Sequence, residues 1–140
     1  MWFQKTFRLP AYGRGFNLIT KEIKAELESI TKVKVGICHI YIHHSTASLT
    51  INEQTDPTVR EDFESHFNAM VPQNAPYYKH NSDQPDNMTA HLKASILGSS
   101  LTIPITNGKL ALGTWQGIYL CEHRNTPPSS RKLTITVNGE

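Results

Sequence analysis

Short segments in which apolar and polar residues alternate recur along this chain, and they constrain its fold more than any other feature. The segments are residues 2–9, 33–44, 47–51, 101–105 and 133–137. Alternation places one face of a segment in a core and the other in solvent, which is typical of antiparallel strands. Asn107-Gly108 is a strong signal for a two-residue hairpin turn, and residues 110–118 form its expected return strand. The sequence therefore predicts a largely antiparallel sheet.

Three other stretches have apolar residues three or four positions apart, as on one face of a helix. The first starts near Ile19, with Thr20 as its expected N-cap. The second is marked by Asp56-Pro57, an N-cap residue followed by proline at the first helical position. The third is a short helix over residues 87–97, after a long irregular loop. Strands remain in the majority, so we predict a single domain of the α+β class, with a largely antiparallel sheet and two or three helices.

Size and composition favour one soluble domain spanning residues 1–140. No apolar stretch is long enough to span a membrane, and the N-terminal residues lack the apolar core of a signal peptide. Cys38 and Cys121 match no metal-ligand or redox spacing, which indicates buried thiols in a reducing compartment. A net charge of +2 without a basic run does not favour nucleic acid. We therefore expect a cytoplasmic protein with no membrane or nucleic-acid partner.

Seven histidines are many for 140 residues, and three of them suggest a metal site. His44 ends the apolar face of the 33–44 strand, His80 lies in the long loop, and His91 begins the short helix. Imidazole and carboxylate groups together suit zinc or another divalent transition ion. Each histidine alone could equally be a hydrogen-bonded structural residue, and no HExxH or paired CxxC motif is present. Polar residues at nearby element ends extend the candidate set: Ser45, Thr46, Ser48, Asn52, Glu53 and Asp62.

The segment LALGTWQGIYLCEHR contains two glycines in an expected strand, Gly113 and Gly117, on either side of Trp115-Gln116. Glycine weakens a strand unless another backbone or a ligand must come close. Trp115 offers a flat apolar surface for a planar heteroaromatic ring, although a core tryptophan beside a barrel bend is an equally good interpretation. The hydroxyls and charged groups that follow could hold a phosphate or form a solvated turn. They belong to Glu122, His123, Arg124, Ser129, Ser130, Arg131 and Lys132.

Two long motifs resemble the YjbQ-like family, whose members are described as secondary thiamine-phosphate synthases because some supply that activity in bacteria. The motifs are HHSTASLTINEQTDPTVREDFE and PYYKHNSDQPDNMTAHLKASILGSSLTIPITNGKLALGTWQGIYLCEHR. The similarity extends over nearly the whole chain, from WFQKTF to VNGE. It implies an α+β domain with a largely antiparallel, β-sandwich-like or barrel-like core, assembled as a homotrimer. It also implies a polar cleft at or near subunit boundaries that can hold a divalent metal ion, zinc or magnesium.

The resemblance also implies roles for individual residues. The implied metal ligands are His44, His80 and His91. The implied catalytic residues are His44, Glu53, Asp62 and Glu122. The implied substrate-binding residues are Ser45, Thr46, Asn52, Trp115, Gln116, Arg124 and Arg131. Many relatives carry Asp-Gly-Pro-Arg soon after the position of Glu122, whereas this chain has His-Arg followed by NTPPSSR. Either Arg124 or Arg131 therefore takes the role of the family's arginine.

The activity implied by the resemblance is a slow condensation of hydroxymethylpyrimidine pyrophosphate with thiazole phosphate, which releases pyrophosphate. A metal ion would neutralise the leaving group, an arginine would bind phosphate, and Trp115 would contact the pyrimidine. Two alternatives stay open. One is another metal-dependent reaction on a phosphorylated or heterocyclic metabolite, and the other is a trimer that binds a metabolite without catalysis. A measured turnover number separates the two enzymes from each other, and tight binding without turnover indicates the third hypothesis.

Overall fold

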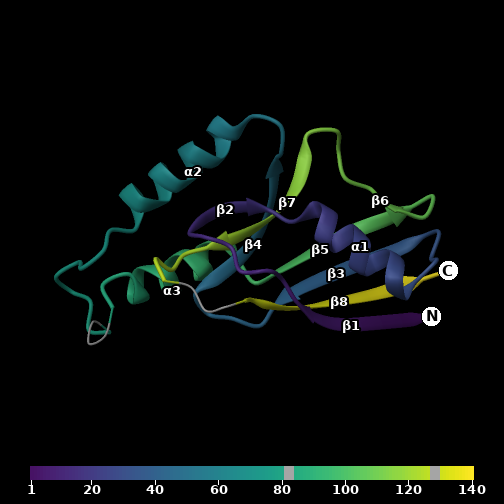
Figure 1. The fold of residues 1–140 in the computed structure, drawn as a ribbon, viewed down its shortest axis with the longest axis horizontal. Helices are drawn as coiled ribbons and strands as arrows, with labels where there is room; N and C mark the ends of the chain where they lie inside the picture. The colour runs from purple at the N-terminus through teal and green to yellow at the C-terminus, as the bar shows by residue number, and fades with distance from the viewer. Residues whose placement is uncertain (81–83, 127–129) are drawn as a thin grey trace.

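The computed structural model describes residues 1–80, 84–126 and 130–140, whose strands form two antiparallel sheets (Figure 1). The larger sheet has the order β1 (Trp2–Arg8), β8 (Lys132–Gly139), β3 (Gly36–Ile42), β5 (Ser100–Thr106) and β6 (Lys109–Leu110). The smaller sheet has the order β2 (Gly15–Leu18), β7 (Gln116–Glu122) and β4 (Ala47–Glu53). The helices of the described residues are α1 (Thr20–Ile30), α2 (Pro57–Met70) and α3 (Asn87–Leu97). The predicted α+β class, with an antiparallel core, is confirmed.

Apolar side chains from both sheets and from α1 meet in one core. The strand β3 contributes Cys38, Ile40 and Ile42, which are buried, whereas Tyr41 on its other face is exposed. The predicted phase of this strand is therefore confirmed. Cys38 and Cys121 are both buried free thiols, as predicted, and burial raises their pKa values to about 11 and about 12.

The predicted hairpin is present, but its return strand is shorter than expected. Asn107 and Gly108 have φ angles of +52° and +76° and connect β5 to β6, which ends at Leu110. The next strand, β7, pairs with β2 and β4 in the smaller sheet. The prediction of one continuous strand over residues 110–118 is therefore wrong, because the chain leaves the larger sheet after β6 and crosses to the smaller one.

The crossing segment, residues 111–115, explains the two glycines. The Oε1 atom of Gln116 accepts a hydrogen bond from the backbone N–H of Gly113 at 2.7 Å, which closes a turn. Gly113 therefore precedes β7 and does not lie inside a strand, contrary to the prediction. Gly117 does lie within β7, and a Cβ atom there would come within 2.8 Å of Gln54 Cβ. The close approach that a strand glycine indicates is confirmed at this position.

The start of α1 differs from the prediction. Ile19 is the N-cap, and Thr20 is the first helical residue. The Oγ1 atom of Thr20 instead accepts a hydrogen bond from the backbone N–H of Ile118 at 2.9 Å, so this hydroxyl ties α1 to β7. The predicted cap is wrong because the hydroxyl is used between elements. The four-residue β2 was not predicted, because a strand this short shows no clear alternation.

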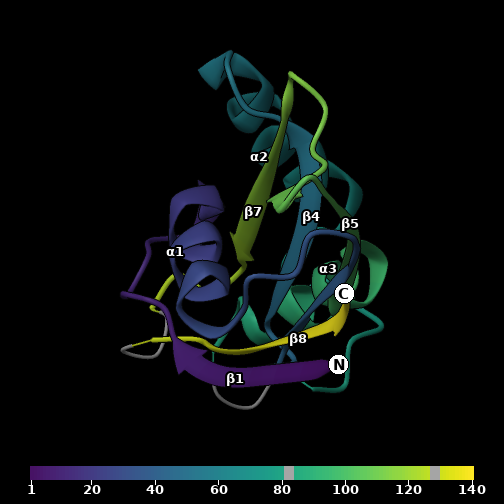
Figure 2. The same ribbon diagram turned by 90° about the vertical axis from the view of Figure 1, so that its right-hand side faces the viewer.

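The helix α2 begins as predicted, since Asp56 Oδ1 accepts a hydrogen bond from the backbone N–H of Thr58 at 3.0 Å. None of its residues is buried. Phe63 and Phe67 are half-buried against Phe16, with ring centroids 5.3 and 5.9 Å apart from it. Figure 2 shows α2 lying far from β1 and β8 of the larger sheet. Among the described residues, no helix is long and apolar enough to cross a membrane.

Candidate active site

A cavity of about 270 Å³ lies between the β3–β4 connection and α3. Its lining residues are His44, Ser45, Ala47, His91, Ala94, Ser95, Gly98 and Ser99. His44 and His91, both predicted from the sequence, therefore meet at one cavity although they come from different elements. Hydroxyl groups and two imidazoles on a mostly small-residue wall make it a polar site for a small ligand.

The tautomer of His91 follows from its partner. Its Nδ1 donates a hydrogen bond to the backbone carbonyl of Ser45 at 3.1 Å, and a carbonyl oxygen can only accept. In the neutral ring the lone pair is therefore on Nε2, which is the arrangement found in most metal-binding histidines. The ring of His80 lies beside it, with centroids 5.3 Å apart. The side-chain amide of Asn87 donates a hydrogen bond to His80 Nε2 at 3.0 Å. Two of the three predicted metal ligands are thus neighbours.

His44 uses its Nε2 differently, because this atom accepts a hydrogen bond from the backbone N–H of Lys132 at 2.8 Å. The proton of the neutral ring is therefore on Nδ1. Burial lowers the pKa of His44, and the positive charges of Arg131 and Arg8 lower it further. Among the residues that the structure describes, no group of three or more His, Cys, Asp or Glu side chains could hold a metal ion. The three-histidine metal site stays a prediction.

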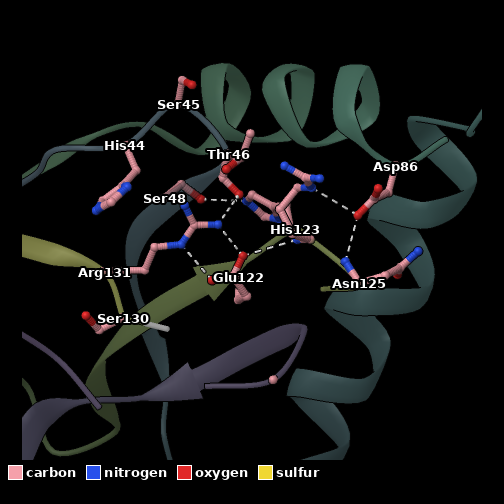
Figure 3. A network of polar contacts seen from close by, with 12 residues as sticks. His44, Ser45, Thr46, Ser48, Asp86, Glu122, His123, Asn125, Ser130 and Arg131 are labelled. Carbon is pink, nitrogen blue, oxygen red and sulfur yellow. Dashed lines mark hydrogen bonds and ion pairs between the residues drawn. The ribbon is translucent and has the colours of Figure 1, made fainter. Parts of the chain in front are cut away.

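A buried ion pair lies behind the cavity (Figure 3). Glu122 and Arg131 are 1% and 4% exposed, and two hydrogen bonds join them: Nε to Oε2 at 2.7 Å and Nη2 to Oε1 at 2.5 Å. Arg131 Nη2 also donates to the backbone carbonyl of Thr46 at 3.4 Å. Arg124 instead pairs with Asp86 at 3.2 Å. Arg131 is therefore the arginine joined to the acidic residue that ends β7, and the pair connects this strand end to the backbone of Thr46.

The other predicted residues gather at the opposite end of β4. Ala47 lines the cavity, whereas Glu53 ends the strand roughly 20 Å away, at about 3.4 Å per residue. There Glu53 pairs in register with Gln116, and the backbone N–H of Gln54 donates to the carbonyl of Trp115 at 2.8 Å. Asn52 is the neighbour of Glu53 on the same strand, and Asp62 is exposed on α2. Within one subunit, the predicted residues therefore lie in two groups, one at the cavity and one at the Glu53 end of β4.

Trp115 is 62% exposed, so the interpretation of this residue as a core tryptophan is wrong. It belongs to the crossing segment before β7, which leaves its ring outside both sheets. Of the predicted phosphate-binding group, Ser130 Oγ accepts a hydrogen bond from Arg8 Nη1 at 3.3 Å. Ser129 lies outside the described residues.

A family model described as UPF0047 protein YjbQ-like matches residues 5–140. The chain belongs to this family. It is 48% identical to UPF0047 protein YjbQ of Salmonella typhimurium over 140 residues, the whole length of both chains. It is 42% identical to UPF0047 protein YugU of Bacillus subtilis over 123 residues, 86% of this chain and 87% of that one. The fold is similar to that of a YbjQ-like protein of unknown function from Sulfolobus solfataricus, with a TM-score of 0.87, 30% identity, and coverage of 100% and 99% of the two chains.

Two buried charged residues beside the site of this YjbQ-like protein were not predicted. Asp86 is 2% exposed and accepts hydrogen bonds at Oδ2 from the backbone N–H of Asn125 at 2.7 Å and from Arg124. Lys93 is 1% exposed, and burial lowers its pKa. The apolar spacing of Leu92 and Ile96 predicts a different buried face for this helix, but Ile96 is 54% exposed. The face that is buried contains Thr89, Ala90 and Lys93, so local spacing gave no signal for Lys93.

A buried Ser48–His123 pair links β4 to the end of β7 in this YjbQ-like fold. Ser48 Oγ and His123 Nε2 are 2.8 Å apart, and both side chains are almost completely buried. Burial lowers the pKa of His123 to about 3, and the charges of Lys93, Arg14 and Arg131 act in the same direction. The ring is therefore neutral in the folded protein at any pH near neutrality.

We expect His123 to make the fold sensitive to acid. Unfolded His123 binds a proton near pH 6.5, whereas folded His123 binds it only near pH 3. Between these values the unfolded state holds more protons, so stability is complete above pH 6.5 and decreases as the pH falls, by up to about 1.4 kcal/mol per unit. Urea unfolding from pH 7 to pH 4 measures this slope. His123→Gln keeps a donor for Ser48 and should make the slope shallower, whereas His39→Gln on the outer face should not; equal slopes would contradict the assignment.

Proposed function

We propose that this YjbQ-like chain is a secondary thiamine-phosphate synthase, which condenses hydroxymethylpyrimidine pyrophosphate with thiazole phosphate at the His44–His91 cavity. The observation that carries the proposal is the fixed orientation of His91, whose Nδ1–H bond to Ser45 leaves the Nε2 lone pair free beside His80. Across the cavity, His44 keeps an Nδ1–H donor that can bind a phosphate oxygen. The hydroxyls of Ser45, Ser95 and Ser99 line the same cavity and supply further donors.

His80 and His91 are the residues that would hold a divalent ion, and their imidazole nitrogens favour zinc over magnesium. His80 and His44 would each have to give up a hydrogen bond to bind the ion through Nε2. The Nε2 atom of His80 accepts from the side-chain amide of Asn87, and that of His44 accepts from the backbone N–H of Lys132. A bound ion would neutralise negative charge as pyrophosphate leaves. The chain's own donors, His44 and the serine hydroxyls, would orient the phosphates.

In a homotrimer, the group of site residues at the cavity of one subunit could meet the Trp115–Gln116 group of the next subunit. The cavity volume of about 270 Å³ is small for two substrates, and the Trp115–Gln116 end of the same chain is too far away to complete it. Exposed Trp115 and the helix α2, which has no buried residue, are both surfaces that a neighbouring subunit can cover. We propose that Trp115 of one subunit contacts the pyrimidine in the cavity of the next.

The direct test is product formation by protein purified from a host without its own thiamine-phosphate synthase, since a trace of that enzyme would mimic a slow rate. Light scattering should give about three times the 15.8 kDa mass of the chain. A mass near 15.8 kDa would contradict the shared cleft. Tight binding of the substrates without turnover would contradict catalysis and leave a metabolite-binding protein.

Mixing two variants tests the shared cleft. His91→Ala should be deficient in turnover, and Trp115→Leu should mainly raise KM, because a ring surface contacts ground and transition states alike. If each site takes His91 from one subunit and Trp115 from its neighbour, trimers refolded from an equal mixture contain about a quarter intact sites. The kcat/KM of the mixture should then exceed that of either variant alone. Activity no higher than the mean of the two variants would mean that both residues act within one subunit, or that one does not act.

A further inference from the structure

A second cavity, of about 380 Å³, lies on the other side of α3 from the first. Four separate parts of the chain line it: Arg14 before β2, Asn68 near the end of α2, Val71 with Gln73 after α2, and Asn125 after β7. The helix α3 separates the two cavities. His91 and Lys93 are two positions apart on it, and residues so spaced point to nearly opposite sides of a helix. His91 lines the first cavity, whereas Lys93 reaches Asn68 in the wall of the second.

Two cations share a single neutral oxygen in this wall. Arg14 Nη2 and Lys93 Nζ donate hydrogen bonds to the same atom, Asn68 Oδ1, at 2.7 and 2.6 Å. This is the one hydrogen bond that Lys93 makes with the described residues, although its side chain is 1% exposed. Arg14 also donates from Nε to Glu64 at 3.0 Å and from Nη1 to Asn125 Oδ1 at 2.5 Å. The carboxylate of Glu64 is thus bonded to Arg14 but not to Lys93, and the two cations together exceed this one negative charge by one.

Burying an ammonium group without a counter-ion is costly, and the cost falls when an anion lies close. The walls also contain amide groups that can donate to an anion. Asn68 and Asn125 present their oxygens to Arg14, which leaves the amide NH₂ groups of both side chains as donors. Gln73 adds a third side-chain amide. The guanidinium of Arg14 has further N–H groups, in the planar arrangement that suits oxyanions.

We propose that this second cavity binds a phosphate group, with Arg14 and Lys93 supplying the charge and Asn68, Asn125 and Gln73 supplying hydrogen bonds. A phosphate carries nearly two negative charges at neutral pH and has more acceptor oxygens than a carboxylate, so it matches the two cations and three amides better. The group can be inorganic phosphate or the phosphate of a monoester. The site does not depend on the proposed synthase activity, because none of these residues lines the first cavity.

Calorimetric titration of the full-length protein with inorganic phosphate tests the site, at constant ionic strength in chloride and with a chelator present. The wild type should bind one phosphate per chain. Asn68→Asp places a carboxylate between the two cations, so it should weaken phosphate binding about 10–100-fold. Asn138→Asp adds the same charge on β8, in the larger sheet, and should leave the affinity unchanged. Lys93→Met should also lose binding while remaining folded, since it removes a buried charge.

Three results would overturn the proposal. They are no saturable binding by the wild type, equal affinity in the wild type and Asn68→Asp, and acetate binding as tightly as phosphate. Glycerol 3-phosphate binding more tightly than inorganic phosphate would identify a monoester as the ligand, and the reverse order would identify the free ion. His91→Ala should bind phosphate normally while losing synthase activity. Failure of one proposal is thereby distinguishable from failure of the other.

Discussion

Replacing Glu122 with Gln should lower the free energy of unfolding by about 3–5 kcal/mol, the usual cost of leaving one member of a buried ion pair without its partner. Arg131 is 4% exposed and uses both Nε and Nη2 on the two carboxylate oxygens. In Glu122→Gln the guanidinium keeps one acceptor and faces an amide NH₂ in place of the second. Chemical denaturation at pH 7, followed by circular dichroism, measures the change.

The partly exposed ion pair between Lys5 and Glu26 is the control for the fully buried one. Its side chains are 40% and 27% exposed, with an N–O distance of 2.6 Å. Because water screens such a pair, Glu26→Gln should change stability by only about 0–1 kcal/mol. Similar losses in the two variants would show that the Glu122–Arg131 pair is not the buried anchor described above.

Replacing His91 with Ala should reduce kcat for thiamine phosphate formation on the order of 10²–10³-fold, the typical cost of losing one electrostatic contact to a developing charge. The ring faces a cavity and has one hydrogen bond, to Ser45, so the fold should tolerate its removal. KM should change less than kcat, because the lost interaction strengthens as pyrophosphate leaves. Steady-state kinetics on protein from a synthase-deficient host give both constants.

His66→Ala is the control for this prediction, since His66 is an exposed histidine on α2. It should retain the activity of the wild type. Product formation unchanged by His91→Ala in correctly folded protein would place the activity elsewhere in the chain.

Alternation predicted which face of β3 is buried, but not which strands are neighbours. The segment around Trp115 shows why. Its apolar residues predict one strand that returns along β5 after Asn107-Gly108. In the structure β7 instead belongs to the smaller sheet. Alternation records burial of a face and carries no information about the hydrogen-bonded edge of a strand. The change of sheet follows from long-range packing, which local sequence does not contain.

The sequence predicts those residues of the candidate site that lie at the ends of predicted strands and helices. His44 follows a strand and His91 lies early in a helix, and residues at such positions often meet. The buried charges were harder to foresee. Lys93 could not be predicted, because lysine is rarely buried and the apolar pair Leu92 and Ile96 indicates another face of α3. The sequence leaves open whether Arg124 or Arg131 takes the role of the family's arginine, because the choice depends on how the chain after β7 returns to β8. In the structure Arg131 pairs with Glu122 and Arg124 pairs with Asp86.

The lack of any buried residue on α2 has a consequence for how the molecule comes apart. Elements held by few buried contacts open locally at much lower free energy than the whole domain. Besides the half-buried contact of Phe63 and Phe67 with Phe16, α2 is joined to its neighbours by hydrogen bonds from Arg14 and Lys93 to Glu64 and Asn68. Asn68 lies on the same helix. Local opening of α2 would therefore remove one wall of the second cavity while the sheets stay intact.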